Sequence, residues 1–554
     1  MPRFAAVAGL AFLVTLTAAP TPAGATPAPD EAAPAPIGAA SAQAHAGAAL
    51  PASTSAHTAA LPASTSAHTS ALPVSASAYT SALPAPASAH TLALAASTSA
   101  HTSATLAALA VSPASVALAA SAQLHTAFAQ AHAARAAAAP VIPPAALKLA
   151  RETLPANDGW GSAGAGTTGG SAADDAHVAV VRTRAELIAA LGGDAAANGQ
   201  NATPKIVLVS GRIDLREGKS CDDFADPAYD LDAFLAAYDP AVWGRATRPS
   251  GPLEDARVQS TRNQSAQIRI NVGSNTTIVG INGGRLDHGS LVLTNVSNVI
   301  IRNLEVTDAA DCFPAWDPTD GSAGNWNSLY DLVSLSGATN VWLDHNTFSD
   351  GNNHDSDQPL YFNRPYQVHD GATDFIRGSD LITVSWNDYY DHDKTMLIGS
   401  TDTPGVDVGK LRVTVHHNRF GNVIQRAPRV RFGQVDVYNN LYVATDEEYG
   451  YSLGVGVESS IYAENNYFRL SADVPASDVI AYWRGTRITT VGNLVQVSGR
   501  APQPVDLVGA YNAAYEPDLS PDAGWTPTLR TRLDPAQAVP AIVAAGAGAR
   551  RLHR

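Results

Sequence analysis

The sequence predicts an all-β fold, a parallel β-helix in which each coil of the chain stacks on the coil before it. Two observations predict it: a series of short runs rich in β-branched and aromatic residues, and an asparagine at or near the end of eight of these runs. The runs are KIVLVSG, QIRINVG, TTIVGIN, NVIIRNL, NVWLDHN, LITVSWN, RVTVHHN, QVDVYNN, SIYAENN and ITTVGN. The asparagines are Asn282, Asn303, Asn346, Asn387, Asn418, Asn440, Asn466 and Asn493.

The spacing of these asparagines favours a solenoid over other β folds. Successive asparagines are 21 to 43 residues apart, and a lower limit of roughly 20 residues is typical of one solenoid coil. Asparagine tolerates left-handed turn conformations, and stacked asparagines can hydrogen-bond along the axis of such a fold. The longer intervals predict loops inserted on one face. A β-sandwich also has short strands and turns, but the recurring asparagine favours the β-helix.

Residues 1–25 have the pattern of a secretory signal peptide. Arg3 supplies a positive charge, the apolar run AAVAGLAFLVTLTAA follows, and Ala23-Gly24-Ala25 offers small residues for cleavage. A membrane anchor is the alternative, but the run is shorter than the roughly 20 residues that a span requires. We therefore expect a secreted, extracellular protein with no membrane span in its mature form.

Residues 26–145 repeat a unit such as LPASTSAHTAA with a period of eleven residues. An eleven-residue period can indicate a coiled coil, but Pro51, Pro62, Pro73 and Pro84 each follow a leucine of the repeat and oppose helix formation. The evenly spaced histidines leave a metal-binding tract as an alternative. The composition favours a disordered Ala/Ser/Pro/Thr-rich linker that precedes a folded domain over residues 146–554.

The predicted domain contains the whole formal net charge of −15, because residues 1–145 have two arginines and two acids. An acidic domain makes nucleic acid an improbable partner, and we expect a monomer. Two cysteines exclude a disulfide scaffold and a multi-cysteine zinc site. Whether Cys221 and Cys312 form a disulfide stays open at this point. One helix is expected over RTRAELIAALG from Arg182, with Gly192 as its stop.

Charged residues separate into an acidic and a basic segment. Residues 344–407 contain twelve Asp and no Glu, and residues 411–433 contain five Arg and no acid. Most of these aspartates suit turns, but carboxylates in loops also suit calcium, which takes six to eight oxygens. Asp370 and Asp374 are the better candidates, since residues four apart on a strand point the same way. Asp331 lies 39 residues before Asp370, which can place it one coil below.

The basic segment QRAPRVRFG leaves two interpretations open. Arginine forks bind carboxylates in a bidentate manner, so a row of arginines beside calcium suits a polymer that carries many carboxylates. Ion pairs between the same arginines and the nearby aspartates are equally compatible with the sequence.

Several motifs in order strongly resemble the pectate lyases of polysaccharide lyase family one: WNSLYD, VWLDHNTFSDG, HDGATDF, VSWNDYYDHDKTMLIGS and HHNRFGNVIQRAPRVRFG. The resemblance extends from about residue 147 to LDPAQAVPAIV near the end of the chain. It implies a right-handed parallel β-helix with long loops on one face. It also implies cleavage of α-1,4-linked polygalacturonate by calcium-dependent β-elimination, which gives 4,5-unsaturated oligogalacturonates.

The resemblance assigns roles to individual residues of this chain. Asp331, Asp370 and Asp374 match the calcium ligands, and Lys394 matches a lysine that contacts a substrate carboxylate. Arg426 matches the catalytic base, and Arg431 matches the arginine that binds substrate beside it. Because arginine normally keeps its proton, we expect activity to rise into alkaline pH.

Three alternatives to a pectate lyase remain. A β-helical glycoside hydrolase on the same polymer requires an acid and a carboxylate that positions water, and the pair of Lys394 and Arg426 argues against it. A noncatalytic polysaccharide-binding solenoid does not require calcium-binding aspartates together with the arginines. A pectin lyase-like enzyme is the third.

Overall fold

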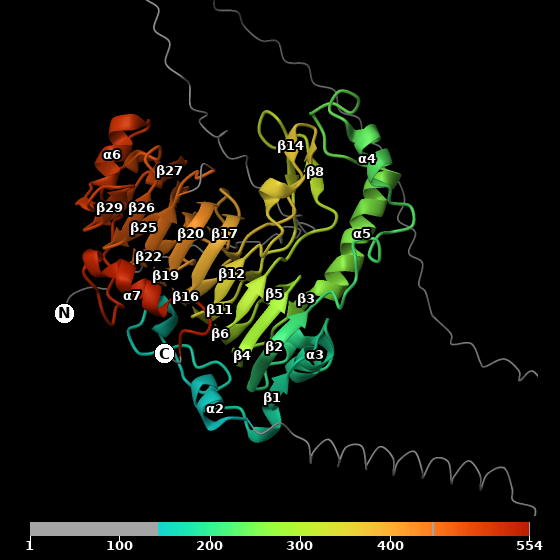
Figure 1. The fold of residues 1–554 in the computed structure, drawn as a ribbon, viewed down its shortest axis with the longest axis horizontal. Helices are drawn as coiled ribbons and strands as arrows, with labels where there is room; N and C mark the ends of the chain where they lie inside the picture. Colours follow the sequence, from blue (N-terminus) through green and yellow to red (C-terminus); the bar gives the residue numbers. More distant parts are fainter. Residues whose placement is uncertain (1–141, 446–447, 553–554) are drawn as a thin grey trace, which may run out of the picture. The chain divides into compact units, whose positions relative to one another are not determined.

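The computed structural model describes residues 142–445 and 448–552. The expected signal peptide and almost all of the expected linker lie outside the described residues. The described chain forms a right-handed parallel β-helix whose coils stack along one axis (Figure 1). The predicted fold class is therefore confirmed.

One side of the solenoid is an eight-stranded sheet in which every pairing is parallel. Its strands are short, and β18 and β21 have two residues each. In stacking order they are β3 Arg269–Asn271, β5 Ser290–Thr294, β10 Val333–Ser336, β15 Thr373–Ile376, β18 Leu397–Ile398, β21 Arg429–Val430, β24 Leu453–Gly456 and β27 Ile480–Trp483.

An 18-stranded sheet forms the remaining sides in two rows of strands. The first row contains β1 Val178–Val181, β2 Lys205–Asp214, β4 Thr276–Asp287, β6 Ser297–Arg302, β11 Thr339–Asp344, β16 Asp380–Ser385, β19 Val413–His416, β22 Gln434–Tyr438, β25 Ser460–Glu464 and β28 Ile488–Val491. The second row contains β7 Glu305–Thr307, β12 Thr347–Ser349, β17 Asp388–Lys394, β20 Arg419–Gln425, β23 Leu441–Ala444, β26 Tyr467–Leu470, β29 Leu494–Val497 and the antiparallel β30 Gln503–Pro504.

Each complete coil uses one strand from the eight-stranded sheet and one from each row, as β15, β16 and β17 do. Nine of the ten predicted runs overlap the first row, and QIRINVG alone overlaps the eight-stranded sheet, at β3. The expected helix is α3, Arg184–Leu191, with the Thr183 hydroxyl accepting from the Glu186 amide and Gly192 at its end. The ten predicted strands and the predicted helix are therefore confirmed.

Six of the eight asparagines form a continuous buried ladder at the turn between the two rows. Each side-chain Nδ2 donates to the Oδ1 of the asparagine in the next coil, at 3.0–3.1 Å, through Asn346, Asn387, Asn418, Asn440, Asn466 and Asn493. The expected stacking of side chains does not extend to Asn303 and Asn282, although both have the left-handed backbone that was expected of the turn asparagines (φ +54° and +50°). Leu304 takes the ladder position in its coil, since its amide donates to Asn346 Oδ1. Asn303 lies one residue earlier and donates to the carbonyl of Gly280 at 2.7 Å.

Aromatic rings stack inside the solenoid along the second row. Phe348, Tyr389, Phe420, Tyr442 and Phe468 follow one another with ring centroids 4.5–5.1 Å apart. All five are almost fully buried. In each of these five coils the stacked ring lies two residues after a ladder asparagine, so apolar and polar contacts both stabilise the same register.

Helices and loops surround the coils. Figure 1 shows α3 and α6, Leu507–Ala514, at opposite ends of the stack of strands. A lobe beside the coils contains α4 Leu231–Tyr238, α5 Pro252–Ile268, and two hairpins, β8 Ala315–Asp317 with β9 Asn325–Asn327 and β13 Leu360–Tyr361 with β14 Arg364–Pro365. Cys221 and Cys312, left open by the sequence, form a disulfide in this lobe.

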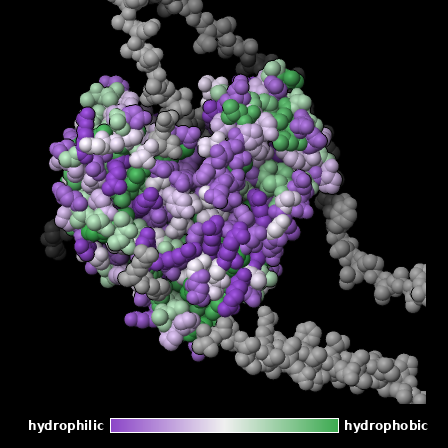
Figure 2. All heavy atoms as spheres, in the orientation of Figure 1, coloured by the Kyte–Doolittle hydropathy of each residue, from purple (hydrophilic) through white to green (hydrophobic). Residues whose placement is uncertain are grey.

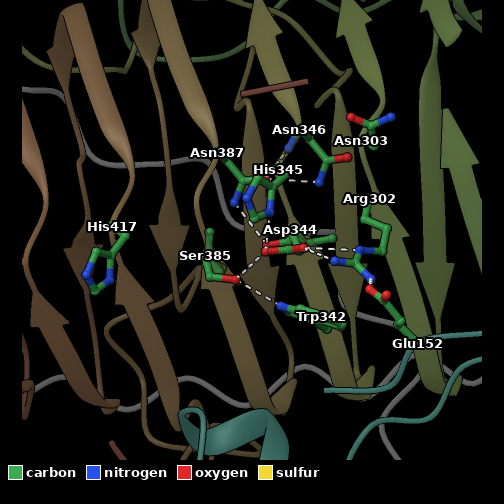
Figure 3. Close-up of polar contacts among 12 residues, drawn as sticks. Glu152, Arg302, Asn303, Trp342, Asp344, His345, Asn346, Ser385, Asn387 and His417 are labelled. Atoms are coloured by element: carbon green, nitrogen blue, oxygen red, sulfur yellow. Dashed lines mark hydrogen bonds and ion pairs between the residues drawn. The ribbon is translucent and has the colours of Figure 1, made fainter. Parts of the chain in front are cut away.

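The segment after α2, Pro144–Ala150, is attached to the outer face of the first row (Figure 3). Arg302 donates to Glu152 at 2.9 Å and to Asp344 at 2.8 Å, and Asp344 also accepts from the Ser385 hydroxyl at 2.8 Å. Burial raises the pKa of Asp344, but the charges of His345 and Arg302 and the hydrogen bonds from His345 and Ser385 lower it to about 2. The depression of about 600 Å³ beside these residues is thus lined by side chains that bind one another.

In the part of the chain that the structure describes, every helix is too short or too polar to cross a bilayer.

The asparagine ladder generates a stability prediction. Asn387→Ala removes an acceptor for Asn346 and a donor to Leu343 and Asn418, all buried, so it should lower the free energy of unfolding by about 2–4 kcal/mol. Asn352→Ala, at an exposed loop position, is the control and should change it by less than about 0.5 kcal/mol. Denaturant unfolding measures both, and equal values would mean that the ladder does not stabilise the coils.

Candidate active site

Asp331 and Asp374 come together because two coils are in register. Val333 of β10 lies opposite Thr373 of β15, so Asp331, two residues before Val333, lies opposite Gly371. The Gly371 amide donates to Asp331 Oδ1 at 3.0 Å, and the Leu397 amide of the following coil donates to Asp374 Oδ1 at 3.0 Å. Both carboxyl groups are more than nine-tenths buried. The expected separation of one coil between Asp331 and Asp370 agrees with this register.

Gly371 leaves the space that the two carboxyl groups occupy. A Cβ at this position would lie 2.8 Å from Asp331 Oδ1 and closer still to Asp374 Oδ1, and real Cβ atoms do not approach other atoms this closely. The missing side chain therefore creates a cradle with carboxylate oxygens from two successive coils.

The electrostatics of this cradle favour a cation. Burial, followed by repulsion from Asp370, raises the pKa of Asp331 to about 7. Burial also raises the pKa of Asp374 well above its usual value, with Asp331 and Asp370 adding to the effect and Arg426 opposing it. Like-charged carboxylates out of water are costly unless protons or a bound cation neutralise them.

Asp370 lies at the more exposed edge of the cradle, with 30 % of its side chain accessible. It precedes β15, which begins at Thr373, so the sequence argument that Asp370 and Asp374 share one strand is wrong. Its carboxylate is 3.6 Å from Lys394 Nζ, and Lys394 ends β17. Asp370 therefore borders both the acidic cradle and the ammonium group of Lys394.

Lys394 and Arg426 occupy neighbouring positions in successive coils. Lys394 pairs with Gln425, the last residue of β20, and Arg426 follows directly. Arg426 has a left-handed backbone (φ +59°), and its carbonyl accepts from the Met396 amide at 2.6 Å. Its side chain is buried to 5 % exposure. The turn from the second row into the eight-stranded sheet thus gathers Asp331, Asp370, Asp374, Lys394 and Arg426.

Arg431 follows β21 and is also buried. Its Nε donates to Asp402 at 2.5 Å and its Nη1 to the carbonyl of Gly399 at 2.9 Å. The ion-pair interpretation of the arginine segment therefore applies to Arg431, which pairs with Asp402, and its binding of a substrate carboxylate stays a prediction.

The aspartates offer part of a calcium shell. Among the described residues, no set of three or more His, Cys, Asp and Glu side chains converges closely enough to hold a metal ion by itself. The cradle nevertheless presents carboxylate oxygens, the atoms that calcium prefers, and calcium takes six to eight oxygens. The residues therefore fit calcium as part of its shell, and the remaining oxygens would have to come from other groups.

Sequence reasoning missed a buried network behind Asp370. His369 lies 3.1 Å from Asp308 and 3.3 Å from Asp355, and His392 lies 2.5 Å from Asp350. Burial lowers the pKa of His369, but the aspartates outweigh it and raise the value to about 10. The network fixes the backbone that leads into Asp370. The sequence shows only that His and Asp alternate in these loops. It does not show which residues of different loops pair with one another.

Figure 2 shows hydrophilic residues across the middle of the face in view, whereas hydrophobic residues gather over α4. Val242 and Trp243, just after α4, are exposed. A parallel β-helix with acids and cations clustered at one turn defines the class of the protein as a solenoid with a charged candidate site.

Comparisons with known proteins agree with this class. A family model described as pectate lyase matches residues 251–519. The pectate lyase of Bacillus subtilis (strain 168) is 43 % identical over 417 residues, covering 74 % of this chain and 95 % of the relative. Pectate lyase E of Dickeya chrysanthemi is 36 % identical over 374 residues, covering 66 % of this chain and 76 % of the relative.

Solved structures show the same similarity. The thermostable pectate lyase PL 47 matches with a TM-score of 0.71 and 45 % identity, over 73 % of this chain and all of that one. A pectate lyase bound to a hexasaccharide matches with a TM-score of 0.68 and 42 % identity, over 73 % of this chain and all of that one. The chain belongs to the pectate lyase family and is a polysaccharide lyase.

The cradle generates a prediction about Gly371. Gly371→Ala should weaken calcium binding by about 10–100-fold, because the added methyl group displaces both carboxyl groups. Gly405→Ala is the matched control, since the nearest atom to its Cβ is 3.9 Å away. Calcium titration calorimetry checks both variants, with thermal unfolding to show that they fold. Unchanged affinity in Gly371→Ala would place the calcium site elsewhere.

Proposed function

We propose that this enzyme cleaves α-1,4-linked polygalacturonate by calcium-dependent β-elimination and releases 4,5-unsaturated oligogalacturonates. The observation that carries the proposal is the pair of buried carboxyl groups, Asp331 and Asp374, that share the space beside Gly371 next to Lys394. A substrate with a carboxylate on every sugar suits this site, because its carboxylates can complete a calcium shell and bind the neighbouring cations.

Asp331, Asp370 and Asp374 would hold the calcium. When bound, calcium neutralises the C6 carboxylate of the substrate and makes the adjacent C5 proton more acidic. Lys394 donates to a substrate carboxylate and orients the sugar, since its ammonium group lies at the edge of the cradle. Arg431 binds a further carboxylate in the same row.

Arg426 accepts the C5 proton in this proposal. The electron pair of the C5–H bond forms the C4–C5 double bond, the C4–O bond breaks, and the departing oxygen takes a proton from solvent. Arg426 must be neutral to accept a proton, and an arginine side chain normally keeps its proton. Neutral arginine is still a minor species at neutral pH, so the reaction rate should rise with alkaline pH.

Export is also part of the proposal. The pattern of residues 1–25 supports a signal peptide, and the linker of residues 26–145 would hold the enzyme domain of residues 146–554 away from the cell. N-terminal sequencing of enzyme from culture medium tests this, and a first residue at or near Met1 would contradict it.

One assay separates the proposal from its alternatives. Digestion of polygalacturonate followed by ultraviolet absorbance detects the unsaturated product, and EDTA should abolish the signal. New reducing ends without absorbance would indicate a hydrolase, and neither signal would indicate a noncatalytic binding protein. Activity on methyl-esterified pectin without calcium would indicate a pectin lyase-like enzyme.

The role of Arg426 generates a kinetic prediction. Arg426→Lys keeps the charge but not the placement of the guanidinium, so kcat should fall by about 10²–10⁴-fold with little change in KM. Arg412→Lys, in a pair with Asp380 and with none of the candidate site residues, is the control and should keep kcat. Steady-state kinetics at saturating calcium and alkaline pH measures both. A near-normal kcat for Arg426→Lys would eliminate Arg426 as the proton acceptor.

A further inference from the structure

Arg484 lies beside Arg431, although no motif of the sequence assigns it a role. Asp402 Oδ1 contacts Arg431 Nε at 2.5 Å, and Asp402 Oδ2 contacts Arg484 Nη2 at 2.5 Å. Each oxygen of one carboxylate therefore meets a different guanidinium group. This is the arrangement with which two arginines bind a single carboxylate.

The strand order of the eight-stranded sheet explains why the two arginines meet. Arg431 follows β21 and Arg484 follows β27, and β24 lies between these strands. In the middle coil, Gly456 lies opposite Arg431 by strand register and forms an isolated bridge with Arg484. A Cβ at Gly456 would collide with the carbonyl of Val430 and lie 3.0 Å from Arg431 Cγ. Because the middle coil has no side chain there, both guanidinium groups reach the same carboxylate.

The two arginines differ in exposure. The side chain of Arg431 is 3 % exposed, whereas that of Arg484 is 51 % exposed, and Asp402 between them is 21 % exposed. Asp402 belongs to the connection between β18 and β19 and to neither strand, so its side chain can move without breaking strand pairing. A carboxylate from solution can therefore reach Arg484 and replace Asp402.

We propose that Arg431 and Arg484 form a subsite for a uronate carboxylate, which Asp402 occupies in the free enzyme and leaves when a polygalacturonate chain binds. The inference rests on the proposed function and extends its binding site by two coils beyond Arg431, roughly 10 Å at the spacing of adjacent strands. Exchange of one carboxylate for another keeps the net charge of the subsite unchanged. The exposed position of Arg484 limits its contribution to a modest gain in affinity.

The experiment compares variants in steady-state kinetics on polygalacturonate at saturating calcium. Arg484→Gln should raise KM by about 3–10-fold and leave kcat within about 2-fold, because the subsite binds substrate away from the reacting bond. Arg484→Lys should have a KM between those of Arg484→Gln and the wild type, since lysine keeps the charge without the bidentate geometry of the guanidinium group. Arg487→Gln, at an exposed arginine three residues further along, is the matched control.

Asp402→Asn tests whether Asp402 competes with the substrate carboxylate or instead holds the two arginines in position. If Asp402 competes with substrate, this variant should have a KM equal to or below that of the wild type. A raised KM for Asp402→Asn would overturn the inference, because Asp402 would then hold the arginines in place for substrate. Equal KM values for Arg484→Gln and Arg487→Gln would also overturn it. Turnover by the wild type tests the proposed function separately, since the inference concerns only the ratios of KM.

Discussion

In-register stacking of parallel strands is the constraint on which the rest of this molecule depends. The site is assembled from Asp331, Asp374, Lys394 and Arg426, which are contributed by successive coils of the chain. No local contact brings them together; the pairing of Val333 with Thr373 and of Lys394 with Gln425 does. The asparagine ladder and the stacked rings of the second row stabilise that register over six and five coils respectively. A slip of one residue would turn every side chain of a strand to the other face.

The same register imposes an electrostatic cost. It buries two carboxyl groups beside Gly371, where repulsion and lost hydration raise their pKa values. Lys394 and Arg426 border them, so acids and cations alternate along the turn. Such an arrangement contributes little to folding, and strongly perturbed titratable groups in a cleft are typical of functional sites. The apolar interior and the asparagine ladder stabilise the coils, and this stability offsets the cost of burying the carboxyl groups at one turn.

The sequence predicted the first row of strands well because the asparagines repeat once in each coil. It did not predict most of the eight-stranded sheet, since strands as short as β18 and β21 are too brief to leave a pattern of alternation. The long helix α5 was missed, although Pro252 at its start and Glu254 and Asp255 in its first turn are helix signals. The motifs located the candidate site residues, but the meeting of Asp402 with Arg484 depends on coil register across 82 residues, which local sequence does not encode.

The central claim is that the aspartate cradle carries protons until a cation replaces them, and proton release on calcium binding tests it most directly. The pKa of Asp331 is raised from 3.8 to about 7, so this group is mostly protonated at about pH 6 and mostly ionised well above pH 7. Calcium requires the ionised form, so binding at about pH 6 should release about one proton or more per calcium, and fewer as the pH rises through 7. Calorimetric titrations in two buffers of different ionisation enthalpy measure that number. Calcium binding with identical heats in both buffers at about pH 6 would contradict the account.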